Sequence, residues 1–207
     1  MKLQTWPGHK PAALSLIVPD GNIDPRLWLS ALRTHDLQAT FFVSPTDVLR
    51  DVAAWQELIS AGNEIGNGCL NGVTDDGMLP NWTLRMIQQE VHMAQTFFDD
   101  MFPSYEADCF MAPGHNLSCA EGDYAGILTD VYRYLLTTWD GANATDQSLT
   151  SLRTCRPSVA LNSTLSDGWS IARLTSLDDL EEVGQWVFDH PSERWCATVT
   201  KVGRIAV

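Results

Sequence analysis

Short apolar runs alternate with segments of helical periodicity along most of the chain. Residues 13–18 and 39–43 are continuous apolar runs with the length of buried strands. Between them, a proline at position 25 opens a segment over 26–35 whose apolar residues fall on one broad helix face. The clearest helical period covers 83–101, where large apolar residues recur every three or four positions. The pattern predicts an α/β protein.

The remaining periodicity extends this alternation to the end of the chain. We expect two more helices, over 47–61 and 177–189, and further strands over 64–68, 109–113, 134–139, 158–161, 169–174 and 195–199. Apolar strands that alternate with helices are typical of a parallel sheet covered on both faces. Seven or eight mostly parallel strands favour a distorted (β/α) barrel, with an open, doubly wound sheet as the alternative. No repeat or linker interrupts the chain, so we expect a single domain over 1–207.

Charge and composition restrict the classes of partner. The chain carries 26 acidic and 13 basic residues, a net charge of −13, which repels a phosphate backbone and excludes nucleic acid as a partner. No stretch approaches the roughly 20 apolar residues that span a bilayer, and the first residues lack a secretion signal. We therefore expect a cytoplasmic protein without membrane association. Five scattered cysteines predict free thiols rather than a disulfide framework or a zinc knuckle.

Four short motifs follow one another along the chain. They are Asp-Gly at 20–21, Ala-Thr-Phe-Phe at 39–42, Gly-Asn-Glu-Ile-Gly-Asn at 62–67 and Phe-Met-Ala-Pro-Gly at 110–114. In this order they resemble the Asp-Asp-Gly, Ala-Thr-Phe-Phe, Gly-His-Glu-Ile-Gly-Asn-His and Phe-Arg-x-Pro-Gly motifs of the polysaccharide deacetylases, carbohydrate esterase family 4. The resemblance extends from about residue 13 to 199. It implies a distorted barrel with a groove at the carboxyl ends of its strands, and hydrolysis of N-acetyl groups on sugars.

The resemblance also implies a metal site. The family uses a divalent ion, usually zinc, held by one Asp and two His, which activates water for attack on the amide carbonyl. Aligned with those motifs, Asp20 keeps the carboxylate ligand. Gly68 and Gly72 stand at the two His positions, and neither has a side chain to coordinate an ion. A lone carboxylate is a poor transition-metal site, so we expect no metal cofactor.

The remaining chemical positions of the family are also replaced. The general base is an Asp in the family and Pro19 here, which has no titratable group. Met111 stands where an Arg would orient that base. The late His that acts as general acid should fall near Leu174 or Thr175, and there is no His there. The sequence therefore predicts a catalytically inactive deacetylase-like protein that keeps a groove for a carbohydrate or a protein partner.

Two alternatives remain open. His115 follows a predicted strand, where barrel enzymes place working groups, and Asp76 and Asp140 lie in loops that also follow strands. Asp140 is a candidate for the groove, whereas Asp20, Asp76 and His115 could form a remodelled metal site, using zinc or another divalent ion, in an active hydrolase of N-acetyl or ester bonds on carbohydrate. Against this, loop carboxylates are usually solvated and a strand-end His is more often a packing residue. The other alternative is a structural subunit whose barrel mouth packs on a second copy as a homo-oligomer.

Overall fold

Eight parallel strands form the central sheet. The computed structural model describes residues 6–19, 23–68, 76–144, 147–163 and 168–206. The strands are Ala12–Val18 (β1), Ala39–Val43 (β2), Glu64–Asn67 (β3), Cys109–Met111 (β4), Tyr134–Trp139 (β7), Leu152–Thr154 (β8), Trp169–Arg173 (β9) and Arg194–Cys196 (β10). Their order is β10-β1-β2-β3-β4-β7-β8, and β9 pairs with β1.

The sheet closes on itself. One edge of β1 pairs with β9, while its other edge pairs first with β10 and then with β2. Cys155, directly after β8, donates its N–H to the carbonyl of Ile171 at 3.0 Å and accepts the N–H of Arg173 at 2.8 Å. This bridge joins β8 to β9, so β1, β2, β3, β4, β7, β8 and β9 form a ring. The predicted (β/α) barrel is confirmed.

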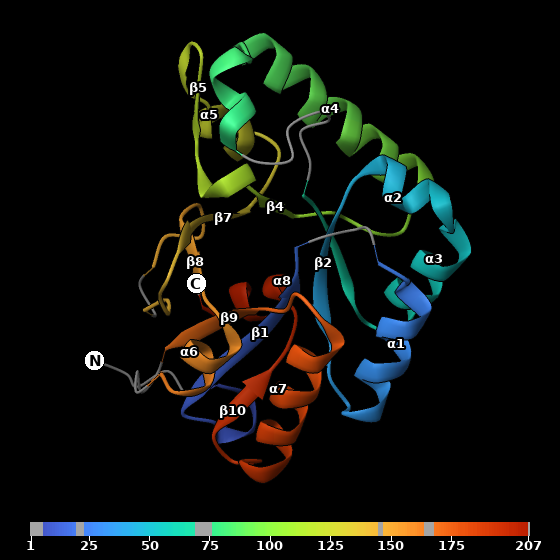
Figure 1. Cartoon of the computed structure of the whole chain (residues 1–207), viewed down its shortest axis with the longest axis vertical. Coiled ribbons are helices and arrows are strands. Elements are labelled where there is room, and N and C mark those ends of the chain that lie inside the picture. The colour runs from blue at the N-terminus through green and yellow to red at the C-terminus, as the bar shows by residue number, and fades with distance from the viewer. Residues whose placement is uncertain (1–5, 20–22, 69–75, 145–146, 164–167, 207) are drawn as a thin grey trace.

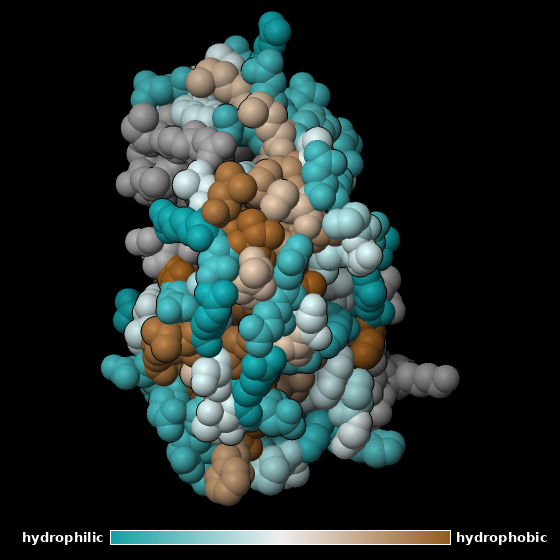
Figure 2. Space-filling model, turned by 90° about the vertical axis from the view of Figure 1, so that its right-hand side faces the viewer, coloured by the Kyte–Doolittle hydropathy of each residue, from teal (hydrophilic) through white to brown (hydrophobic). Residues whose placement is uncertain are grey.

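Helices surround the strands. They are Pro25–Thr34 (α1), Pro45–Arg50 (α2), Val52–Ser60 (α3), Leu84–Met101 (α4), Ala125–Thr129 (α5), Pro157–Leu161 (α6), Leu177–Asp189 (α7) and Val199–Gly203 (α8). Three 3-10 turns, Pro7–His9 (η1), Asp76–Asn81 (η2) and Pro113–His115 (η3), and a small hairpin, Ser118–Cys119 (β5) with Gly122–Asp123 (β6), complete the elements. Helices α1, α3 and α4 lie along one side of the strands (Figure 1). Figure 2 shows that side as mostly hydrophilic, with a band of apolar side chains.

Alternate residues of each strand face the barrel interior or the helices, and the buried apolar side chains form three clusters, one inside the barrel and two under the helices. The barrel interior is filled by side chains such as Ile17, Phe42, Leu136 and Ile171. The outward-facing neighbours pack under the helices, where the Phe41 ring meets Trp28 and Trp55 edge-on with centroids 6.0 and 5.8 Å apart. Such aromatic pairs add about 0.5–1.5 kcal/mol each beyond their area. The alternation determines which strand-end residues point into the barrel.

The amino ends of the strands are closed by α8 through a buried carboxyl group. Glu64, 5% exposed, accepts hydrogen bonds from the Thr40 hydroxyl at 2.6 Å, the Thr200 backbone N–H at 3.2 Å and the Thr200 hydroxyl. Thr40 in turn accepts the Val199 N–H at 3.0 Å. Burial raises the pKa of Glu64, because desolvation disfavours its charged form. Through these hydrogen bonds Glu64 attaches α8 to the amino end of the barrel, opposite the carboxyl ends of the strands.

Three sequence predictions need correction. Residues 158–161 form helix α6 and not a strand, because Pro157 occupies the first helical position. The helix expected over 47–61 is two helices, since Asp51 has extended φ of −160° and its side chain accepts the Ala54 N–H as a new N-cap. The last strand ends at Cys196, and Val199 already belongs to α8.

Two further expectations concern cysteines and membranes. Cys109, Cys119, Cys155 and Cys196 are free thiols, as expected, and Cys69 lies outside the described residues. Within the described ranges, no helix has both the length and the apolar character needed to cross a bilayer.

Candidate functional site

The carboxyl ends of the strands bring four side chains together at the barrel mouth. They are His115, Trp139, Thr154 and Arg173, which we call the mouth cluster. The Arg173 Cζ atom lies 5.2 Å from the centre of the Trp139 ring, and the His115 ring centre lies 5.4 Å from it. His115 Nε2 is 3.1 Å from the Thr154 hydroxyl oxygen. The Trp139 indole ring therefore contacts both the Arg173 guanidinium and the His115 imidazole.

Strand register explains why these side chains converge. A bulge in β7 between Leu136 and Thr138 shifts the pairing, so that Trp139 is opposite Thr154 of β8. Paired residues of a sheet point to the same face, and Thr154 is two positions from the interior residue Leu152. Trp139 and Thr154 therefore both point into the barrel.

Arg173 reaches the mouth by the same alternation along β9. Trp169 and Ile171 are interior residues, so Arg173, two positions further, also points inward. The sequence alignment places the family's late His near Leu174 or Thr175, and neither of these residues faces the mouth. Leu174 is fully buried in the outer core, and Thr175 bonds to Asp179 at the start of α7. Arg173 is the β9 residue that faces the mouth.

His115 is held by an unusual backbone turn. Gly114 and His115 have φ of 55° and 60°, in the left-handed region that residues other than glycine rarely adopt. The His115 N–H donates to the Ala112 carbonyl at 2.9 Å and fixes the turn after β4. Burial and the neighbouring Arg173 charge lower the pKa of His115 below 6.5. This shift favours the neutral imidazole, which suits the hydrogen bond of His115 to the Thr154 hydroxyl.

Of the other predicted site residues, those that the structure describes do not belong to this cluster. Asp140 follows β7 with φ of 59° and is exposed, and its charge helps burial to raise the pKa of Cys155 to about 11. Pro19 is partly buried directly after β1. Asp20 and Gly72 lie outside the described residues, as does the side chain of Asp76. Of the groups suggested for a remodelled site, only His115 lies in the cluster, within the described part of the chain.

The aligned catalytic positions that are described, one metal-ligand position and the position of the orienting Arg, do not suit metal-dependent chemistry. Gly68 N–H donates to the Val43 carbonyl, and the Gly68 backbone is pressed against Phe42. Met111 is 8% exposed and packs in the barrel core with Phe42 and Leu136. Among the described residues, no three His, Cys, Asp or Glu side chains are grouped closely enough to hold an ion. These residues therefore do not fit the zinc chemistry that the resemblance implies.

Sequence reasoning singled out His115 and missed its three partners. A signal for Arg173 was present, because it is the charged residue in an otherwise uncharged strand, 169–174. Trp139 was also visible in the sequence, as the large aromatic residue that ends its strand. Nothing in the sequence predicted Thr154, since β8 has three residues with an arginine in the middle.

Comparison with solved structures identifies the architecture. The chain is 15% identical to the peptidoglycan deacetylase PdaC from Bacillus subtilis, with a TM-score of 0.62 over 95% of this chain and 91% of that one. For a putative polysaccharide deacetylase from Mycobacterium smegmatis, the identity is 12% and the TM-score 0.66, over 96% and 91%. No protein-family model matches the chain, and no curated protein matches it in sequence.

A third similar structure is a pseudoenzyme. BA3943 from Bacillus anthracis, described as a family 4 carbohydrate esterase pseudoenzyme, is 16% identical, with a TM-score of 0.60 over 95% of this chain and 66% of that one. A mutant of BA3943 is described as having restored enzymatic activity, and the likeness to it has a TM-score of 0.56 at 13% identity, over 95% and 68%. The chain thus has the fold of the family 4 carbohydrate esterases, the polysaccharide deacetylases.

Proposed function

We propose that this protein binds a carbohydrate at the mouth of its barrel and does not hydrolyse it. The observation that carries the proposal is the mouth cluster, in which a partly exposed tryptophan lies beside Arg173 and His115. Tryptophan rings provide flat apolar surfaces for sugar rings, and an arginine supplies hydrogen-bond donors for hydroxyl and acid groups. The deacetylase fold raises the expectation of a sugar ligand by analogy.

The absence of hydrolysis follows from the groups at the aligned positions. Pro19 cannot take a proton from water, and general-base assistance alone contributes about 10²–10⁴ to a rate. Gly68 offers no ligand for an ion that would activate water, and Met111 cannot orient a base. Thr154, which His115 contacts, is fully buried, so this pair does not form an accessible nucleophile and base. A solved pseudoenzyme of similar fold offers a precedent for such a loss.

Binding is tested by titrating chitotetraose and acetylated xylotetraose into the protein in a calorimeter. Trp139→Ala should abolish the binding, because the sugar loses its apolar platform. Trp186→Ala is the matched control, because Trp186 lies on α7, stacked on His190, and takes no part in the mouth cluster. Equal loss in both variants, or binding untouched by Trp139→Ala, would contradict the proposed site.

Hydrolysis is tested by following acetate release from the same two oligosaccharides. We expect release at the level of a buffer blank. Chelator-sensitive release that depends on Asp20 and His115 would instead establish the remodelled hydrolase.

A further inference from the structure

Arg173 is a half-buried cation without an anionic partner in the described structure. Its Nε atom is buried and has no hydrogen-bond partner there. None of the ion pairs between described residues includes it. Burial lowers the pKa of its guanidinium, and no carboxylate among the described residues acts against that shift. A charged side chain placed this deep is normally paired, because desolvation of an unpaired charge is costly.

Arg194 shows what a structural arginine looks like in the same fold. It is buried, with 9% of its surface exposed, and its Cζ atom lies 5.9 Å from the centre of the Trp186 ring. In contrast to Arg173, it donates a hydrogen bond to the Ser163 carbonyl at 2.8 Å and so ties β10 to a neighbouring segment. Arg173 makes the same cation–ring contact, but its Nε lacks such an acceptor. Its contact with Trp139 recovers only part of the desolvation cost.

We infer that Arg173 binds a carboxylate carried by the saccharide, so that the ligand of the mouth is an acidic sugar. This inference rests on the proposed function and names the class of its ligand. A guanidinium is planar and pairs with both oxygens of a carboxylate at once. The Trp139 ring holds the guanidinium in place, so less conformational freedom is lost when the acid binds. Arg173 also lies at the carboxyl end of β9, the end of a (β/α) barrel at which ligands bind.

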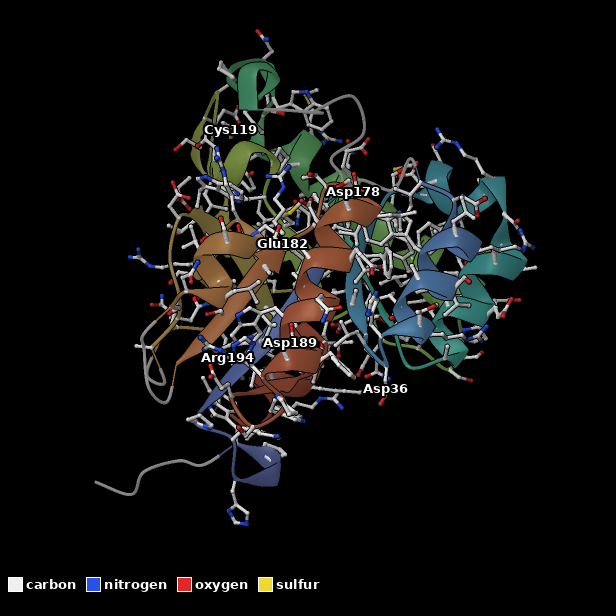
Figure 3. All side chains as sticks on the ribbon, turned by 60° about the horizontal axis from the view of Figure 1, so that its bottom comes forward. Asp36, Cys119, Asp178, Glu182, Asp189 and Arg194 are labelled. Atoms are coloured by element: carbon white, nitrogen blue, oxygen red, sulfur yellow. The ribbon has the colours of Figure 1, made fainter. Side chains whose placement is uncertain are left out.

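The net charge of −13 does not prevent this recognition. Figure 3 shows Asp178, Glu182 and Asp189 along the exposed outside of α7, and not in the barrel interior. At physiological salt, charges separated by more than about 8 Å of solvent are largely screened. Among the members of the mouth cluster, Arg173 is the one with a permanent positive charge, so a carboxylate bound there pairs with it. The acidic exterior slows the approach of an anionic ligand more than it weakens the final contact.

The test compares acids with their neutral methyl esters. One arm uses a tetramer of D-galacturonic acid, whose carboxylates are on the sugar rings. The other uses N-acetylmuramic acid, whose carboxylate is on a lactyl ether. We expect at least one acid to bind about tenfold to a hundredfold more tightly than its methyl ester, as for a charge-assisted pair. The arm that shows this preference identifies where the sugar carries its acid.

Variants then assign the preference to Arg173. Arg173→Gln should remove the preference for the acid, and Arg173→Lys should keep part of it, since lysine retains the charge without the planar fork. Arg85→Gln, at an exposed position of α4, makes the same change in net charge and should bind like the parent. A thermal melt verifies that each variant is folded. In addition, NMR titration of the His115 ring should show its pKa rising when the acid binds, because the new anion offsets the Arg173 charge.

The outcomes separate the inference from the proposed function. If chitotetraose binds in a Trp139-dependent manner but neither acid exceeds its ester, the mouth binds sugars and the inference is wrong. An acid preference that survives Arg173→Gln also overturns it. If no saccharide binds at all, the proposed function fails, and the inference fails with it.

Discussion

Gly68 and Phe42 are in such close contact that no side chain fits between them. A Cβ atom on Gly68 would lie 2.6 Å from Phe42 Cβ and 2.9 Å from the Phe42 carbonyl carbon. Both of those atoms belong to the rigid part of β2, so a rotamer change cannot relieve the contact. Because Gly68 aligns with a metal-binding His of the deacetylases, placing a His there requires a shift of strand β2 or of the segment after β3. A His at position 68 is therefore incompatible with the present backbone packing.

Gly68→Ala should lower the free energy of unfolding by about 1–3 kcal/mol, the usual cost of an overpacked site. Gly126→Ala is the matched control, because a Cβ atom there meets nothing within 4 Å and the residue lies in helix α5. The control should be neutral or gain up to about 1 kcal/mol. Urea unfolding of both variants measures the difference. A Gly68→Ala protein as stable as the control would show that the contact with Phe42 relaxes freely.

The purified protein should carry no stoichiometric zinc, cobalt or nickel. Glycines stand at both aligned His positions, 68 and 72, and a lone Asp20 is too few ligands for such ions. Elemental analysis after dialysis should find much less than one metal per chain, and a chelator should leave the melting temperature unchanged. One tightly held ion per chain would contradict this and favour the remodelled hydrolase.

Glu64→Gln should change how stability depends on pH. Burial raises the folded-state pKa of Glu64 above its value of 4.5 in the unfolded chain. Between these two values, the folded protein holds a proton that the unfolded chain releases. The contribution of Glu64 to stability is therefore fully present below pH 4.5 and is lost as pH rises through the folded pKa. Glutamine does not titrate, so the stability of the variant relative to that of the parent should increase as pH rises from 4.5.

Denaturant unfolding of parent and Glu64→Gln at several pH values measures this gain. Glu182→Gln, at an exposed position of α7, controls for the lost negative charge. Glu64→Ala should instead be less stable at every pH, because it leaves the Thr40 and Thr200 donors without an acceptor, at about 1–3 kcal/mol for each unsatisfied group. If the unfolding free energies of Glu64→Gln and of the parent change with pH in parallel, the Glu64 carboxyl has the same pKa in the folded and unfolded states.

Arg173→Met and Arg194→Met should affect stability in opposite directions. Arg173 has a buried nitrogen without a partner, so an apolar side chain of similar length should be neutral or raise the unfolding free energy. Arg194→Met leaves the Ser163 carbonyl without its donor and should cost about 1–3 kcal/mol. Thermal and denaturant melts of the two variants test the contrast. A large loss in Arg173→Met would indicate a structural role for that arginine and weaken the case for ligand recognition.

The sequence predicted most of the fold, because strong local patterns agree with it. The apolar runs of β1 and β2 and the long period of α4 are clear without any tertiary information. The failures occurred where local signals are ambiguous. The five residues of α6 are too few to distinguish a helix from a strand by periodicity, and β8 is a three-residue strand with an arginine in its centre.

The site could be predicted only in part. The residues that replace the family's metal ligands were visible in the sequence because motifs define those positions. The mouth cluster was not, because it depends on which side of each strand faces the barrel interior. The bulge in β7 turns Trp139 inward, and a shift of one residue would reverse its direction. No sequence signal marked that bulge.

The attachment of α8 to Glu64 has a consequence for how the chain folds as it is synthesised. Glu64 lies in the first third of the sequence, and its Thr200 partner is 136 residues later. Until residues 199–203 leave the ribosome, the carboxyl group and the Thr40 hydroxyl lack these partners, and the amino end of the barrel lacks its closing helix. The N-terminal strands can associate earlier, but the closed ring of strands also needs β9, near the end of the chain. Completion of the barrel therefore waits for residues 199–203, and a chain that stalls before them exposes the apolar side chains of the unsealed barrel interior, which chaperones and proteases can recognise.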